Sequence, residues 1–110
     1  MSQATAPLID PFLQSLRLDR GASDHTLGAY RSDLKHWLAH LNLSPQDDPE
    51  ALEQALQDAD FAALVARWHT DKIQASTLSR RISAFRSFLR FWVNERGWAL
   101  DALDRLPLPK

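Results

Sequence analysis

The sequence is poor in the residue types that define many sites: it has no cysteine, three glycines and one methionine among 110 residues. Without cysteine the chain can form neither a disulfide nor a thiolate metal site, which fits a reducing compartment. Its longest apolar run, residues 61–66, is too short to cross a bilayer. The amino-terminal segment lacks the basic start and apolar centre of a signal peptide. We therefore expect a cytoplasmic protein without membrane contact.

Residues that could build a catalytic or metal centre are also few. Three glycines provide no phosphate-binding loop, and the four histidines assemble no Ser/His/Asp set. Asp33, His36 and His40 come within reach of one another on a helix, but the glutamate of the His-Glu-x-x-His pattern and a further ligand are missing. We expect no catalytic residue, no metal ion and no cofactor in this chain.

Strand signals are scarce, whereas helix signals recur along the chain. Capping residues, prolines at helix starts and glycines at helix ends mark the expected boundaries. The predicted helices cover residues 11–20, 24–41, 49–71 and 77–96, with Asp10, Ser23, Asp48 and Ser76 as amino-terminal caps. Residues 49–71 form either one kinked helix or two short ones, the second opened by Asp58 or Asp60.

Four main helices with short connections must bury their apolar stripes against one another. The expected fold class is therefore all-α, a small orthogonal bundle of four to five helices. We expect one domain over residues 10–105, after a flexible segment at 1–9 and before 106–110, where the prolines are typical of a linker. The expected core residues are Phe12, Leu13, Leu16 and Leu18, then Leu27, Tyr30, Leu34, Trp37, Leu38 and Leu41, and finally Leu78, Ile82, Phe85, Leu89 and Trp92.

The formal net charge of −1 conceals an uneven distribution. Residues 46–71 contain seven acids and one arginine, whereas residues 72–97 contain six bases and one acid. Such segregation gives a folded domain a dipolar field, and its basic part favours a polyanionic partner. Helices that differ only in the charge of a solvated face would show the same pattern. We expect the acidic segment to lie away from the polyanion, at the solvent or at a subunit contact.

The outward face of the last helix combines arginines with small polar residues. No acid occurs between Lys72 and Asn94, although acid–base pairs at four-residue spacing would stabilise a solvated helix better. Serines leave room for a phosphate backbone, and the arginine fork binds phosphate or guanine edges with two bonds. Arg81 and Arg86 flank this face, and we expect their charged heads to reach outward. The predicted DNA-binding residues are Ser76, Thr77, Arg80, Arg81, Ser83, Arg86, Ser87 and Arg90, with His25, Thr26, Arg31, Ser32 and Lys35 on the second helix.

Two other functions fit parts of this pattern. A helical protein-interaction module would self-associate through the acidic face of one copy and the basic face of another. A helix-turn-helix regulator is disfavoured, because no tight turn joins a short helix to a compact recognition helix. Salt-dependent binding to duplex DNA, weakened by Arg80→Glu in an intact fold, is the behaviour expected of a DNA-binding domain.

Two segments, GASDHTLGAYRSDLKHWLAHL at 21–41 and ASTLSRRISAFRSFLRFWV at 75–93, resemble the amino-terminal core-binding domain of Xer-type tyrosine recombinases. The second segment is closer to the XerC branch than to XerD, and a closing Pro-Lys pair fits the family's linker. The resemblance implies a SAM-like helical bundle that closes over one side of duplex DNA. In that family the second and last long helices cross the major groove, and a separate carboxy-terminal domain closes over the other side.

The same resemblance implies that this chain contributes DNA binding to recombination and that the catalytic residues lie in another domain. The family cuts and rejoins DNA through a covalent phosphotyrosyl intermediate, but the Arg, His and Tyr residues of that reaction belong to the carboxy-terminal domain. Tyr30, the single tyrosine, falls on the buried stripe and is expected to pack in the core. The expected partners are double-stranded DNA at a recombination site and XerD-like recombinase subunits. The expected role is chromosome or plasmid dimer resolution at cell division.

Overall fold

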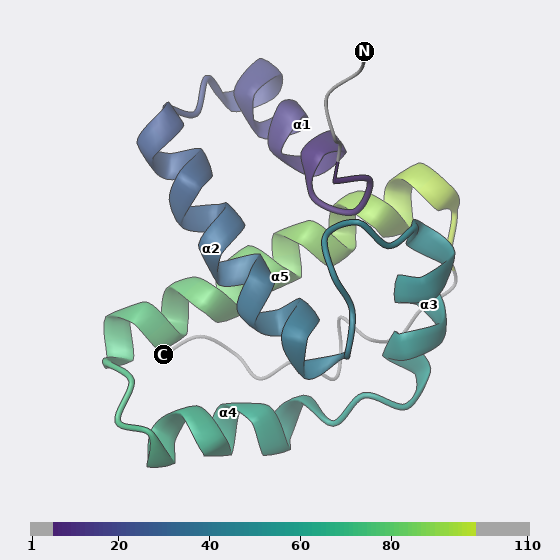
Figure 1. Ribbon diagram of the computed structural model, residues 1–110. Helices are drawn as coiled ribbons and strands as arrows, with labels where there is room; N and C mark the ends of the chain where they lie inside the picture. Colours follow the sequence, from purple (N-terminus) through teal and green to yellow (C-terminus); the bar gives the residue numbers. More distant parts are fainter. Residues whose placement is uncertain (1–5, 99–110) are drawn as a thin grey trace.

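The computed structural model describes residues 6–98, which fold into five α-helices and contain no strand (Figure 1). The helices are α1 (Asp10–Arg20), α2 (Asp24–His40), α3 (Pro49–Gln57), α4 (Phe61–Thr70) and α5 (Ala75–Arg96). The predicted all-α class is confirmed, and the segment 49–71 forms two short helices. The expectations for residues 1–5 and 99–110, including the linker, lie outside the described residues.

The long helix α5 runs through the middle of the fold, and the other helices are arranged around it (Figure 1). α2 crosses α5, and α1 lies beside both helices. α3 and α4 follow one another along the opposite side of α5 from α1 (Figure 1). No described helix combines the length and apolar character that a membrane span requires.

Three of the helix starts follow the capping logic expected from the sequence. The side chains of Ser23, Asp48 and Asp60 accept hydrogen bonds from backbone N–H groups of the first turns of α2, α3 and α4. Asp60 rather than Asp58 therefore opens α4. Gly21 and Gly97 end α1 and α5 in the left-handed conformation, with φ of 62° and 66°, which glycine adopts without steric cost.

Two predicted amino-terminal caps are wrong, Asp10 by one position and Ser76 by two. Asp10 is the first residue of α1, and Ile9 holds the capping position; the Asp10 carboxylate instead accepts from the Ala6 N–H at 3.1 Å. α5 begins at Ala75 without a side-chain cap, so Ser76 lies inside the first turn. The start is earlier because the backbone carbonyl of Gln74 already accepts from the Leu78 N–H at 2.9 Å.

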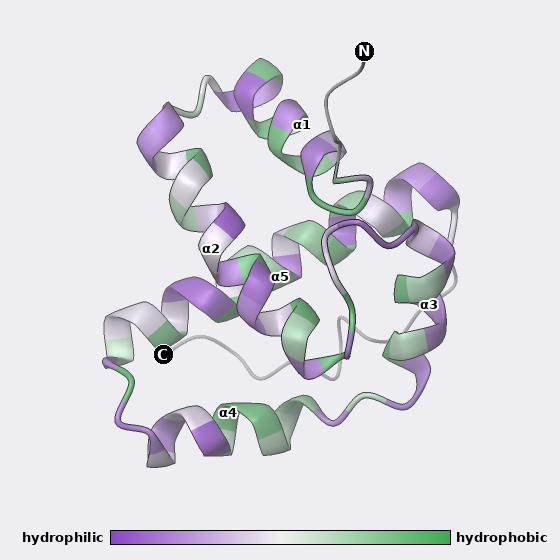
Figure 2. Ribbon diagram, in the orientation of Figure 1, coloured by the Kyte–Doolittle hydropathy of each residue, from purple (hydrophilic) through white to green (hydrophobic). Residues whose placement is uncertain are grey.

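Aromatic residues from several helices meet in the centre of the bundle. Trp37 of α2 stacks on Phe85 of α5 with ring centroids 4.3 Å apart and also contacts Trp68 and Phe61 of α4 edge-on. Apolar residues recur between hydrophilic ones along the helices (Figure 2), as burial of one face of each helix requires. Because α2, α4 and α5 share this cluster, their relative positions depend on it.

Three residues depart from the predicted core, and one of them, Leu41, is only partly buried at the end of α2. Leu18 is 71% exposed, because it lies two positions beyond Leu16 and so points away from the stripe formed by Phe12, Leu13 and Leu16. Tyr30 is half-buried and meets Phe12 edge-on, with ring centroids 6.0 Å apart. The assignment of Tyr30 to packing is consistent with this contact.

Candidate nucleic-acid interface

The residues expected to contact DNA lie on two adjacent helices, α2 and α5, and most of them reach solvent. His25, Thr26, Ser32, Lys35, Ser76, Arg80, Ser83 and Arg90 are exposed, and Arg31, Thr77, Arg86 and Ser87 are partly buried. We call these twelve residues the α2/α5 face. Arg80 and five α2 residues from the helix's first three turns line one hollow of about 370 Å³. His25 and Thr26 of α2 therefore border the same hollow as Arg80 of α5, although they lie far apart from it in the sequence.

Arg80 is held in place by a buried acid. The Asp33 carboxylate is 1% exposed and accepts two hydrogen bonds from Arg80, at 2.7 Å from Nε and 3.0 Å from one terminal nitrogen. The hydrogen bond to Asp33 raises the pKa of Arg80. The Arg80 side chain is nevertheless 54% exposed. Its guanidinium is thus anchored on one edge and open to solvent elsewhere.

The residue patterns alone did not assign a role to Asp33. A signal was present: Asp33 stands beside Leu34 and Tyr30, within the apolar stripe of α2. A carboxylate in such a stripe requires a charged or hydrogen-bonding partner, because burying an unpaired charge is costly. In the structure this partner is Arg80, and Arg81 also lies within ion-pair distance of the same carboxylate.

Arg81 does not reach outward as expected. It is 8% exposed, its guanidinium lies 4.8 Å from the ring centroid of Trp68, and Nε stands 3.8 Å from an Asp33 oxygen without a hydrogen-bond partner. Burial, more than the neighbouring charges, lowers the pKa of Arg81. The spacing explains the error: Arg81 follows Leu78 by three residues and precedes Phe85 by four, so it shares their buried face.

The backbone of Arg81 also links the two helices of the interface. The indole Nε1 of Trp37 donates to the Arg81 carbonyl at 2.8 Å, and both groups are buried. Such a bond fixes the rotation of α5 relative to α2, because a shift of either helix would leave a buried donor and acceptor unpaired. Arg81 therefore belongs to the structure that positions Arg80 and is not part of the α2/α5 face.

His36 lies one turn beyond Asp33 on α2. Burial and the positive charge of Arg81 lower its pKa, while the Asp33 carboxylate acts in the opposite direction. The ring thus favours the neutral state more than a free histidine does. Within residues 6–98 no three His, Cys, Asp or Glu side chains converge in a group that could hold a metal ion.

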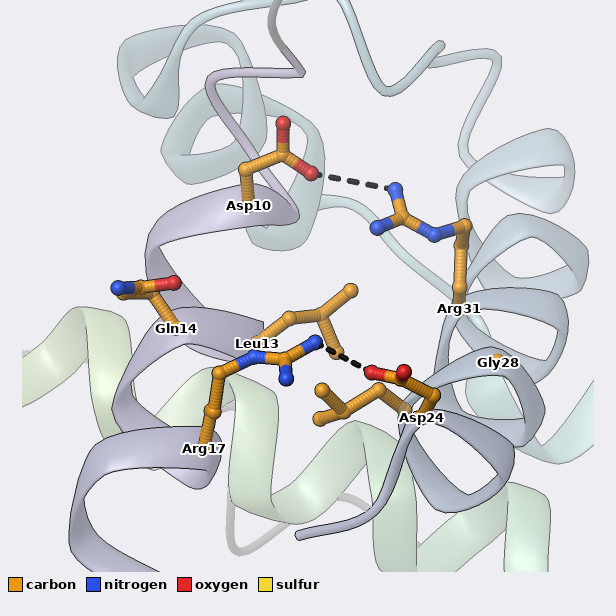
Figure 3. A pocket seen from close by; sticks show the side chains of 8 residues that line it. Asp10, Leu13, Gln14, Arg17, Asp24, Gly28 and Arg31 are labelled. Carbon is orange, nitrogen blue, oxygen red and sulfur yellow. Dashed lines mark hydrogen bonds and ion pairs between the residues drawn. The ribbon is translucent and has the colours of Figure 1, made fainter. Parts of the chain in front are cut away.

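Arg31 lies at the margin of the α2/α5 face, in a cleft between α1 and α2 of about 400 Å³ (Figure 3). Two ion pairs cross this cleft: Arg31 to Asp10 at 3.1 Å and Arg17 to Asp24 at 2.6 Å. Figure 3 shows both arginines extended toward the carboxylate of the facing helix. The charge of Arg31 is therefore compensated within the domain.

Lys35 and Arg90 present the least compensated charges of the α2/α5 face. Both are exposed, and neither forms an ion pair with a residue in the described range 6–98. Arg90 borders a groove of about 210 Å³ between α1 and α5, which Asp19 and Arg20 also line. These two cations can meet an external anion without first breaking an internal pair.

The acidic segment contacts α5 at its far end. Arg96, which is not part of the α2/α5 face, pairs with Glu50 of α3 at 2.8 Å. Both partners are substantially exposed, so the pair contributes little to stability. Asp48 and Asp60 serve as helix caps, which gives part of the acidic charge a local structural role.

Comparison of the sequence with known proteins assigns the chain to a family. Residues 9–96 match the phage integrase N-terminal SAM-like domain. The tyrosine recombinase XerC of Neisseria meningitidis is 35% identical over 88 residues, which cover 80% of this chain and 28% of the relative. XerC of Xylella fastidiosa is 34% identical and XerD of Staphylococcus saprophyticus is 30% identical, each over 103 residues covering 94% of this chain and 34% of the relative.

The chain spans about a third of the length of these curated relatives. No solved structure matches it significantly. The matched region includes all five helices and the whole of the α2/α5 face. The chain therefore belongs to the phage integrase N-terminal SAM-like domain family, and it is similar to the corresponding part of Xer-family tyrosine recombinases.

Proposed function

We propose that the chain is the DNA-binding core-binding domain of a XerC-like site-specific tyrosine recombinase. The observation that carries this proposal is the α2/α5 face, where serines and basic residues share one surface and α5 carries no acid before Glu95. Arginine and lysine bind the phosphates of a duplex, and small polar residues allow the backbone to approach. The family relationship supports double-stranded DNA as the partner of this face.

The chemistry of recombination belongs, in this proposal, to a separate catalytic domain of the whole recombinase. That domain supplies the Arg, His and Tyr residues that cut and rejoin DNA, while the present domain holds the duplex. XerD-like subunits bound to the same DNA are the proposed partners. Chromosome or plasmid dimer resolution in the cytoplasm at cell division is the proposed role, and the identity with XerC sequences supports it.

Removal of single exposed charges tests this function. Lys35→Gln and Arg90→Gln are each expected to weaken binding of the 110-residue chain to a mixed-sequence duplex severalfold at low salt. Each lost phosphate contact should also reduce the slope of log affinity against log salt concentration by about 0.9. Fluorescence anisotropy of a labelled duplex, measured over a range of salt concentrations, gives both quantities.

Arg67→Gln is the matched control, because Arg67 is exposed on α4 and its loss changes the net charge equally. Equal weakening by all three variants would show a general charge effect and contradict a specific face. Arg80→Glu is a poorer test than the sequence indicated, because the new carboxylate would face the buried Asp33 and disturb the fold. If the parent chain instead forms dimers without DNA that Arg86→Glu dissolves, self-association is the better function.

A further inference from the structure

Arg80 and Lys35 both belong to the α2/α5 face, but their surroundings differ. Arg80 pairs with Asp33, a carboxylate that it shares with Arg81, whereas Lys35 pairs with no residue in the described part of the chain. Affinity for phosphate arises mainly from net positive charge and the release of counterions. The neighbouring Asp33 carboxylate, which Arg80 shares with Arg81, reduces what Arg80 gains from that source, and it would repel a phosphate placed on the opposite edge of the guanidinium. Arg80 is therefore less suited to phosphate binding than the unpaired Lys35.

Arg80 keeps free hydrogen-bond donors despite its pairing with Asp33. A guanidinium carries five N–H donors in a fixed plane. Asp33 accepts two of them, from Nε and one terminal nitrogen, so the end of the fork keeps two parallel donors, one on each terminal nitrogen. Arg80 makes no further hydrogen bond within residues 6–98. Two parallel donors match the O6 and N7 acceptors of guanine in the major groove.

Asp33 also fixes the direction of this fork. The carboxylate is fully buried, and its two bonds remove most rotations of the Arg80 side chain. Rotamer freedom that is already lost in the free domain does not oppose binding again. Beside the pair lies the hollow of about 370 Å³, which is lined by His25, Thr26 and Ala29 in addition to the pair itself. This hollow gives a base edge access to the guanidinium.

On these grounds, and given the proposed function, we propose that Arg80 recognises a guanine of the target site and that Asp33 positions it for this contact. Arg80 then determines sequence preference, while Lys35 and Arg90 supply salt-dependent affinity. Arg80 and Lys35 carry the same formal charge, but substitution of Arg80 should change the sequence preference, whereas substitution of Lys35 should change the salt dependence. In this recognition Asp33 acts through Arg80 and is a positioning residue.

The test selects tight binders from a pool of duplexes with a randomised core, using the 110-residue chain, and sequences them. The parent chain should enrich guanine at one position, and Arg80→Lys should reduce that preference roughly tenfold. The salt slope on a fixed duplex should stay unchanged for Arg80→Lys. Lys35→Gln, the matched control, should keep the guanine preference and lose salt slope.

Asp33→Asn provides a second, independent readout. It should release Arg80 and remove a negative charge, so the guanine preference falls while the salt slope rises by up to about 0.9. A purely structural Asp33 would leave the guanine preference unchanged in a variant that remains folded. Thermal melting of each variant checks folding. If Arg80→Lys or Asp33→Asn fails to fold, the double variant that combines Arg80→Gln with Asp33→Asn replaces it.

Other outcomes would overturn the proposal. A uniform loss of affinity for Arg80→Lys across all sequences would make Arg80 a phosphate contact. An unchanged sequence profile would limit the Arg80–Asp33 pair to a structural role. In both cases the parent chain still binds DNA and the proposed function survives. Failure of the parent chain to bind any duplex at low salt would instead contradict the proposed function as well.

Discussion

Asp33→Ala is expected to lower the free energy of unfolding by about 3 kcal/mol. The substitution removes the negative charge next to Arg81, whose guanidinium is almost completely buried against Trp68. A buried cation without a counter-charge is costly, and the lost carboxylate also leaves a small cavity. Arg80 would remain solvated and contribute little to the loss. Urea unfolding followed by circular dichroism measures the change.

Asp24→Ala is the control for this prediction. Asp24 also pairs with an arginine, but its side chain is 86% exposed, so its loss should cost about 1 kcal/mol or less. A loss for Asp33→Ala no larger than that of Asp24→Ala would contradict a structural role for the buried carboxylate. The helices and the aromatic core would then suffice to fix α5 against α2.

Trp37→Ala is expected to lower the free energy of unfolding by about 4 kcal/mol, which is a large part of the stability of a domain of this size. Trp37 is fully buried, stacks on Phe85 and contacts Phe61 and Trp68. Its removal opens a cavity where α2, α4 and α5 meet. The same denaturant experiment measures this loss, with melting temperature as a second observable.

Trp37→Phe separates packing from hydrogen bonding. The phenyl ring can keep the stack on Phe85, but the bond from the indole to the Arg81 carbonyl is lost. An intermediate loss of about 1–2 kcal/mol is expected, because the buried carbonyl loses the hydrogen bond from the indole. Equal losses for the alanine and phenylalanine variants would mean that the hydrogen bond, and not the packing, dominates at this position.

The helices could be predicted from the sequence because their signals are local. Ser23, Asp48 and the two glycines at helix ends act within one turn of the residues they cap. The core stripes follow from spacing alone, and Leu18 departs from its stripe for the same geometric reason. These features need no knowledge of the tertiary fold.

The detailed site was less accessible, because it depends on contacts between helices. Charge counting places Arg80 and Arg81 together on one face, but the structure exposes the first and buries the second. Asp33 lies 47 residues from Arg80 in the sequence, so their pairing appears only when α2 crosses α5. Ion pairs between helices decide which cations are available to a phosphate. Residue spacing within one helix does not predict such pairs.

Binding of duplex DNA by the α2/α5 face is tested most directly by mapping the backbone amides that respond to DNA. A ¹⁵N-labelled 110-residue chain, titrated with a duplex at low salt, should show its largest chemical-shift changes within residues 24–35 and 76–90. The amides of α3 and α4 should change little, since neither helix contributes to that face. Changes centred on α3 and α4, or no change with any duplex, would contradict the account.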